Sequence, residues 1–126
     1  MASFIPTTKD VLDAHERVKP FVKVTPVLSS SAINEIVGAE VFFKCENLQK
    51  IGAFKFRGAC NAVFSLSEEE AKKSVITHSS GNHGAALALA AKMRGIDAYI
   101  IMPKNAPGKA VTVVYRMMFY LNQSLY

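Results

Sequence analysis

Residues 75–102 constrain the fold most, because strand and helix signals alternate there over a short length. Residues 75–78 are a short, mostly apolar run that stops at small polar residues. An alanine-rich stretch follows over residues 83–93, and Gly95 ends it, as expected for a helix closed by a residue in the left-handed conformation. Residues 98–102 are again nearly all apolar, which is typical of a strand buried on both faces of a parallel sheet. This order predicts a βαβ unit.

The preceding residues continue the alternation. Residues 41–45 are an apolar, aromatic run bounded by turn residues, which indicates a strand. Residues 54–66 carry apolar side chains at helical spacing, with a predicted buried stripe of Ala59, Ala62, Val63 and Leu66. Together these segments predict an α/β protein, with a three-layer parallel sheet and flanking helices.

Capping patterns predict three further helical segments. Thr8 or Asp10 can cap a first helix that runs to about residue 18. The serines at 29–31 can cap a short helix that Gly38 closes. Ser67 precedes three glutamates, which favours one more helical turn because acidic residues stabilise the start of a helix.

Composition and charge narrow the class of protein. The chain has 126 residues, half of them apolar, which suits one folded domain and excludes a disordered one. Its net charge of +5 invites a nucleic-acid interpretation, but residues 103–126 contribute Lys104, Lys109 and Arg116 and no acid. Because this basic segment is largely apolar, and no basic face interleaved with aromatic residues appears, we expect no nucleic-acid partner.

Cysteine and histidine usage favours a cytoplasmic protein without a metal. Cys45 and Cys60 lie in apolar or helical contexts without metal-ligand spacing, so we expect reduced thiols. His78 and His83 are poorly spaced to share a zinc ion, and His15 is expected to be structural or exposed. No apolar run approaches the roughly 18 to 20 residues of a membrane span, and no targeting segment is visible.

Residues 49–58 are the first segment in which chemistry is expected. Lys55 lies close to a predicted helix start and between Phe54 and Phe56. Partial desolvation and the positive end of the helix dipole would both disfavour the ammonium form. A neutral lysine amine is a nucleophile that can hold a carbonyl cofactor as a Schiff base. The alternative is an ordinary surface lysine whose stem covers apolar groups.

Residues 77–84 are the second such segment, because there a strand turns into a helix. Backbone N–H groups at a helix start can bind an anion, and Gly81 and Gly84 would let a ligand approach closely. Ser79, Ser80 and Asn82 add short polar side chains. The pattern predicts a site for a carboxylate or phosphate, and the alternative is a simple cap with a tight turn.

Both motifs resemble those of a known enzyme family. QKIGAFKFRGA followed about twenty residues later by THSSGNHGAALA is similar to the fold type II pyridoxal-phosphate enzymes, and specifically to the serine racemase and serine/threonine dehydratase group. TPVLSSSAIN and FFKCENLQK match the same group. The resemblance covers roughly residues 8–107 and implies the N-terminal part of a tryptophan synthase β-like fold.

The resemblance implies a role for each matching residue. Lys55 would be the Schiff-base lysine, and Phe54 would support pyridoxal 5'-phosphate beside it. Asn82 would hydrogen-bond the phenolic oxygen of the cofactor. Ser80 would face Lys55 across the cofactor plane as the acid/base on the opposite face, which racemisation requires because one group removes the Cα proton and another returns it. The substrate carboxylate would be held by Ser79, Ser80, Asn82 and His83.

The implied reaction is racemisation of serine, or its dehydration to pyruvate and ammonia, which begins with the same proton removal. In serine racemases a nucleotide activator contacts the positions that correspond to Ser30, Ser31, Ala32, Lys50 and Ile51. Ala32 and Ile51 depart from the residues common there, which argues against ATP binding. Full-length members are expected to be homodimers, and their Mg²⁺ ligands lie beyond the matched residues.

The extent of the resemblance predicts the domain organisation. Residues 1–68 would belong to a large domain, and residues 69–107 would begin a small one. Residues 108–126 do not fit the family, so we expect a truncated product with a non-homologous tail. The alternatives to an active serine racemase or dehydratase are a threonine dehydratase and an inactive fragment that interacts with full-length subunits.

Overall fold

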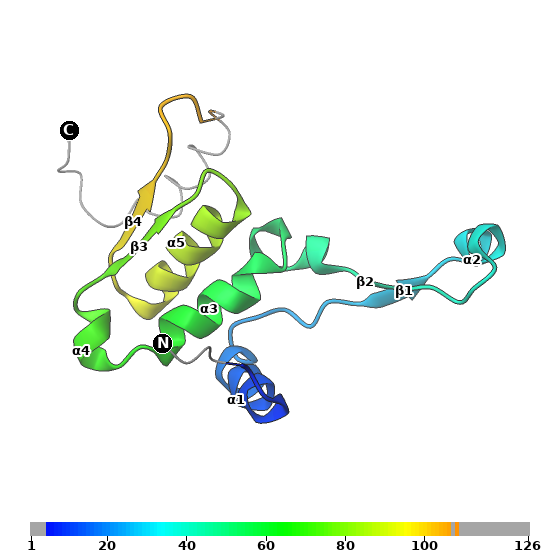
Figure 1. Ribbon diagram of the computed structural model, residues 1–126, viewed down its shortest axis with the longest axis horizontal. Helices are drawn as coiled ribbons and strands as arrows, with labels where there is room; N and C mark the ends of the chain where they lie inside the picture. Colours follow the sequence, from blue (N-terminus) through cyan, green and yellow to red (C-terminus); the bar gives the residue numbers. More distant parts are fainter. Residues whose placement is uncertain (1–4, 107, 109–126) are drawn as a thin grey trace.

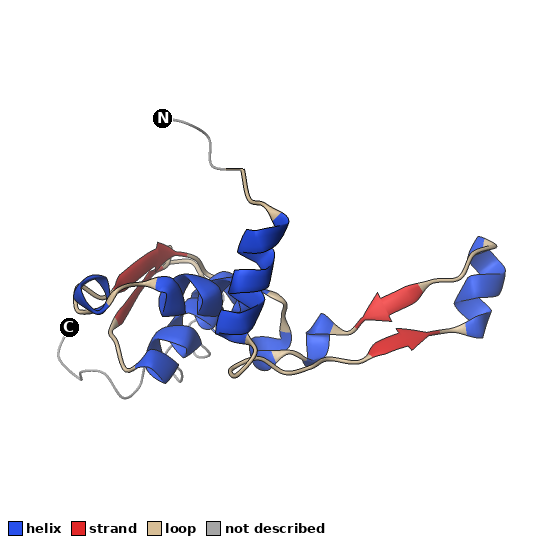
Figure 2. Ribbon diagram, turned by 90° about the horizontal axis from the view of Figure 1, so that it is seen from below, coloured by secondary structure: helices blue, strands red, loops and turns tan. Residues whose placement is uncertain are grey.

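The computed structural model describes residues 5–106 and residue 108, and it has a body and an arm (Figure 1). The body contains α1 (Thr8–Val18), α3 (Lys55–Ser65), α4 (Glu68–Ala71), β3 (Val75–His78), α5 (Asn82–Arg94) and β4 (Ala98–Ile101). The arm contains β1 (Val27–Ser29), α2 (Ser31–Val37) and β2 (Phe42–Lys44), and it extends away from the body (Figure 2). Two short 3-10 helices, η1 (Glu46–Leu48) and η2 (Lys50–Gly52), join the arm to α3.

The βαβ unit predicted from residues 75–102 is present. β3 and β4 are parallel, with Val75 opposite Ala98 and His78 opposite Ile101. α5 connects the two strands and packs against them, and α3 packs against α5. The α/β fold class is confirmed.

The core lies between α3 and α5. Phe56, Cys60 and Val63 of α3 are essentially inaccessible to solvent. They meet a face of α5 made mostly of small side chains, including Ala86 and Ala90, which lets the two helices approach closely. Burial among these apolar groups raises the pKa of the Cys60 thiol.

Local capping chemistry sets the helix ends. α1 starts from Thr7, one residue before the predicted cap, because the Thr7 hydroxyl and the Asp10 carboxylate form a reciprocal capping box. Ser67 and Glu70 form the same box at the start of α4. Gly38 ends α2 with a φ of 65°, as its position predicts.

Two expectations about the strands are wrong. The strand at 42–44 does not join the parallel pair but pairs antiparallel with β1, with Leu28 opposite Phe43. β4 is not buried on both faces, since Tyr99 and Ile101 are 47% and 52% exposed. The physical reason is that α5 covers one face of the strand pair, whereas no described element covers the other. The predicted tail lies outside the described residues apart from Gly108.

Candidate active site

Both predicted segments begin a helix, and the two helices lie side by side. Lys55 is the first residue of α3, and Asn82 is the first residue of α5. At the opposite end, the Arg94 guanidinium of α5 donates a hydrogen bond of 2.8 Å to the carbonyl of Leu66, just after α3. The helices therefore run in the same direction, and Lys55 and the 79–83 loop lie toward the same end of the pair (Figure 1).

Turn η2 connects the two segments through packing. Ile51 contacts Ala85 and Ala88, which lie in the first half of α5. Since η2 comes shortly before Lys55 in the chain, this contact fixes the start of α3 relative to the start of α5.

Lys55 is more accessible than the sequence predicts. The expected partial desolvation is not found, because Lys55 is exposed and Phe54 is 60% exposed. The two phenylalanines diverge, since Phe56 is fully buried in the core while the Lys55 Nζ lies 5.3 Å from the centroid of the Phe54 ring. Lys55 makes no hydrogen bond or ion pair with any described residue, so its amine is open to a ligand.

The 79–83 loop offers unpaired backbone donors. The Ser79 hydroxyl oxygen accepts hydrogen bonds from the N–H groups of Gly81, at 3.3 Å, and Gly84, at 3.0 Å. The bond from Gly84 satisfies one of the backbone N–H groups that have no partner within the first turn of α5. Among the described residues, no partner is found for three other backbone N–H groups of this loop, those of Ser80, Asn82 and His83. Such a cluster suits an anion.

Gly84 is required by close packing. A Cβ atom at this position would lie 2.8 Å from the Ser79 carbonyl oxygen and 3.0 Å from the Ile100 Cγ2 atom. α5 can therefore approach β4 and the loop only because this residue has no side chain. Gly84 was predicted to let a ligand approach closely, whereas in the structure it lets the Ser79 carbonyl and Ile100 approach α5.

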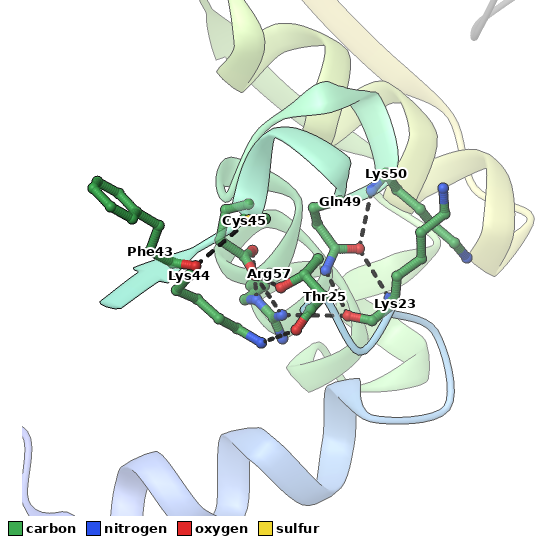
Figure 3. A network of polar contacts seen from close by, with 9 residues as sticks. Lys23, Thr25, Phe43, Lys44, Cys45, Gln49, Lys50 and Arg57 are labelled. Atoms are coloured by element: carbon green, nitrogen blue, oxygen red, sulfur yellow. Dashed lines mark hydrogen bonds and ion pairs between the residues drawn. The ribbon is translucent and has the colours of Figure 1, made fainter. Parts of the chain in front are cut away.

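A partly buried polar network lies at the base of the arm, between the Lys23–Thr25 segment and α3 (Figure 3). Both oxygens of the Glu46 carboxylate accept hydrogen bonds from Arg57, at 2.8 Å from Nε and 2.7 Å from Nη2. The Thr25 hydroxyl donates to the same carboxylate at 2.6 Å. The Gln49 side chain accepts from the backbone N–H of Lys23 and donates to its carbonyl.

The Arg57 guanidinium controls the charge state of Glu46. Together with the Thr25 hydroxyl it favours the carboxylate and lowers the pKa of Glu46 from 4.5 to about 2. The network is therefore ionised throughout the neutral range.

This network was not predicted from the sequence, although two features of the sequence point to it. An acidic residue directly follows the predicted strand at 41–45, and an arginine lies in the first turn of the next helix. Opposite charges at such neighbouring ends could have suggested an ion pair. The residues that were missed are Thr25, Glu46, Gln49 and Arg57.

The positions considered for a nucleotide are not brought together. Ser30, Ser31 and Ala32 lie at the start of α2 in the arm. Lys50 and Ile51 lie in η2, beside α5. In Figure 1 the length of the arm separates these two groups.

The described residues contain neither a cluster of metal-ligating side chains nor a disulfide. No three side chains of the metal-ligating types gather there. Cys45 and Cys60 are both free. Within the same residues, no helix is both long and apolar enough to cross a membrane.

Comparison with known proteins identifies the family. The model of the pyridoxal-phosphate dependent enzymes matches residues 18–118, which is most of the chain and continues past residue 108. The chain belongs to this family. It is 61% identical to the serine racemase of Arabidopsis thaliana over 106 residues, which are 84% of this chain and 32% of that protein. It is 55% identical to a beta-hydroxyaspartate dehydratase of Paracoccus denitrificans over 104 residues, which are 82% of this chain and 33% of that protein.

Comparison with solved structures supports the same family. The structure of maize serine racemase superposes with a TM-score of 0.88 at 50% identity, covering 90% of this chain and 35% of that one. The fold is thus that of the fold type II pyridoxal-phosphate enzymes. The chain spans about a third of the length of the curated relatives it matches.

The residues present fit part of what pyridoxal phosphate needs. The cofactor is an aldehyde with a phenolic oxygen, so it requires a primary amine and a hydrogen-bond donor. Lys55 offers an unpaired amine, and the exposed Asn82 amide has no hydrogen-bond partner among the described residues. Both start parallel helices at one end of the body.

Proposed function

We propose that this chain supplies the reactive lysine and the carboxylate-binding loop of a pyridoxal-phosphate enzyme that acts on serine or a related hydroxy amino acid. The reaction would be racemisation, or β-elimination of water followed by hydrolysis of the released enamine to a keto acid and ammonia. The observation that carries the proposal is that the unpaired amine of Lys55 and the open N–H groups of the 79–83 loop lie toward the same end of two parallel helices.

Each residue would contribute a distinct action. Pyridoxal phosphate, when bound, supplies an electron sink that makes the Cα proton of an amino acid removable. Lys55 would hold the cofactor and move that proton on one face, and Ser80 would do so on the other. Asn82 would donate a hydrogen bond to the cofactor, which Phe54 would flank. The substrate carboxylate would accept hydrogen bonds from the loop of Ser79, Ser80, Asn82 and His83.

The test is covalent trapping followed by assay. The purified chain is mixed with pyridoxal phosphate, its near-ultraviolet and visible absorbance is recorded, and the adduct is reduced with borohydride and mapped by mass spectrometry. We expect the label on Lys55, its loss in Lys55→Ala, and its retention in Lys72→Ala, a matched control at an exposed lysine that directly follows α4. Absence of the label from Lys55 in the unaltered chain would contradict the proposal.

A second candidate is a non-catalytic chain that docks on longer subunits. The uncovered face of β3 and β4, with Ile76, Tyr99 and Ile101 exposed, favours it. Formation of D-serine or pyruvate from L-serine by the purified chain would support the enzyme. A Lys55 adduct without turnover would favour the docking chain instead.

Four finer statements belong to the same proposal. We propose a homodimer in which a second copy covers apolar residues of the arm, and the free thiols support a cytoplasmic location. The division at residues 68 and 107 stays a prediction. ATP and Mg²⁺ remain open to direct titration, which would reveal any site completed by a second copy.

A further inference from the structure

We infer that the polar network, defined as Lys23, Thr25, Lys44, Glu46, Gln49 and Arg57, positions Lys55 and makes its amine the preferred one for a carbonyl ligand. The inference rests on the proposed function only in taking Lys55 as the reactive lysine. The network residues would be positioning residues, because they would act through Lys55 and not by touching the ligand.

The network surrounds the segment that carries Lys55. Gln49 lies at the start of the turn that leads to Lys55, and Arg57 lies two residues after it. Gln49 is bonded to Lys23, and Arg57 to Glu46. Both ends of the 49–57 segment are therefore attached to other parts of the chain.

Burial makes these attachments specific. Gln49 is only 2% exposed and Thr25 only 4%. A buried amide or hydroxyl without a partner is unfavourable, so each displacement of the segment would leave polar groups unsatisfied. No buried polar side-chain atom among the described residues lacks a partner. A fully satisfied network of this kind favours one geometry over its alternatives.

The turn between the two attachments has an unfavourable backbone. Ile51 has a φ of 61°, which is unusual for a β-branched residue, and Gly52 has a φ of 72°. The Gln49 side chain accepts a hydrogen bond from the Lys50 N–H at 3.0 Å, and the Gln49 carbonyl accepts one from the Gly52 N–H at 2.9 Å. Strained residues persist where the surroundings determine them, and here the determining residue is Gln49.

Two neighbouring lysines, Lys44 and Lys50, have partners for their side chains. The Lys44 Nζ donates to the Thr25 carbonyl at 2.6 Å, within the network. The Lys50 Nζ lies 5.4 Å from the centroid of the Phe56 ring and 3.8 Å from the Met93 sulfur. Lys55 has no such polar partner among the described residues. The same network that holds the turn thus engages one competing amine and leaves Lys55 open.

The experiment compares lysine reactivity in the full chain without any cofactor. Trace acetic anhydride labels the unaltered chain and the variants Glu46→Gln and Arg57→Lys, and the ratio of Lys55 to Lys9 labelling is measured by mass spectrometry, Lys9 being an exposed lysine of α1. Amide hydrogen exchange over residues 50–55 is followed in parallel. Glu46→Gln should lower the labelling ratio severalfold and speed exchange, because a segment released at Arg57 no longer holds the Lys55 amine in its exposed, unpartnered position. Arg57→Lys keeps the charge but loses the bidentate geometry, so its effect should be smaller and in the same direction.

Arg94→Met is the matched control. It removes side-chain hydrogen bonds from the opposite end of α3. It should lower the urea midpoint and leave the labelling ratio and the exchange of residues 50–55 unchanged. Equal changes in Arg94→Met, or no change in Glu46→Gln, would overturn the inference. The proposed function is tested separately by the pyridoxal-phosphate adduct on Lys55 in the unaltered chain, so the two can fail independently.

Discussion

Local sequence patterns predict helices and strands in both the body and the arm, yet only the body has a hydrophobic core. α3 and α5 bury Phe56, Cys60 and Val63 among alanines. In β1, α2 and β2 no residue is buried, although the Gly38 cap is well formed. The comparison teaches that capping and strand patterns set secondary structure locally, whereas burial depends on what lies opposite.

The largest expected effect comes from replacing one phenylalanine in the body by alanine and comparing it with the same change in the arm. Phe56→Ala should lower the free energy of unfolding by about 3 to 5 kcal/mol, since the side chain is fully buried in the body. Phe42→Ala in the arm should cost less than about 1 kcal/mol, because Phe42 is 61% exposed. Urea denaturation followed by circular dichroism measures both. Equal losses would mean that the arm also has a packed environment.

The second prediction concerns the polar network that joins the arm to the body. The pKa of Glu46 is lowered from 4.5 to about 2, so its carboxylate stabilises the fold fully above about pH 4.5. That contribution, on the order of 2 kcal/mol, should disappear as the pH falls from 4.5 toward 2.

Urea midpoints measured from pH 7 to pH 2 test this dependence. Glu46→Gln should be less stable at pH 7 and should flatten the acid part of the profile. Glu69→Gln, which alters an exposed surface pair, is the control and should leave the profile unchanged. An acid profile that Glu46→Gln does not alter would assign the loss of stability to other carboxylates.

The third prediction uses two helical glycines of the body. Gly84→Ala should destabilise by about 1 to 3 kcal/mol, since its Cβ atom would lie 2.8 Å from a backbone oxygen. Gly58→Ala should stabilise by about 0.5 to 1 kcal/mol, because nothing lies within 4 Å of its Cβ position in α3. Opposite signs in thermal unfolding are the expected result. A Gly84→Ala variant at least as stable as the unaltered chain would show that α5 does not approach β4 and the loop as described.

The smallest expected effect is again in the arm. Ile36→Ser should change the free energy of unfolding by less than about 0.5 kcal/mol, because Ile36 is 82% exposed. If a second copy covers the arm, the same substitution should weaken self-association in sedimentation velocity. A large stability loss in the monomer would contradict the exposed position of α2.

Local chemistry was predictable where it depends on a few neighbours. The bounds of α3, α5 and β3 agree with the predictions to within a residue or so, and so does the placement of Lys55 and Asn82 at helix starts. The family resemblance is confirmed by the match over residues 18–118. The roles of Lys55, Ser80 and Asn82 stay predictions until the adduct is mapped.

Other features depended on partners far away in the chain. The exposure of Lys55 arises because Phe54 turns outward and Phe56 inward, which their spacing alone did not show. The Ser79 hydroxyl accepts two backbone hydrogen bonds only because the chain turns back toward it after the strand, and the sequence pattern did not show this turn.

The sequence by itself determined approximately where the main helices and strands begin and end, because capping and periodicity act within a few positions. Its motifs also determined the family to which the chain belongs. Only the tertiary structure decided that β2 pairs with β1, that one face of β4 is uncovered, and that Glu46, Gln49 and Arg57 meet the Lys23–Thr25 segment at the base of the arm. The physical reason is that pairing, burial and polar satisfaction depend on segments distant in sequence, whose meeting no local pattern specifies.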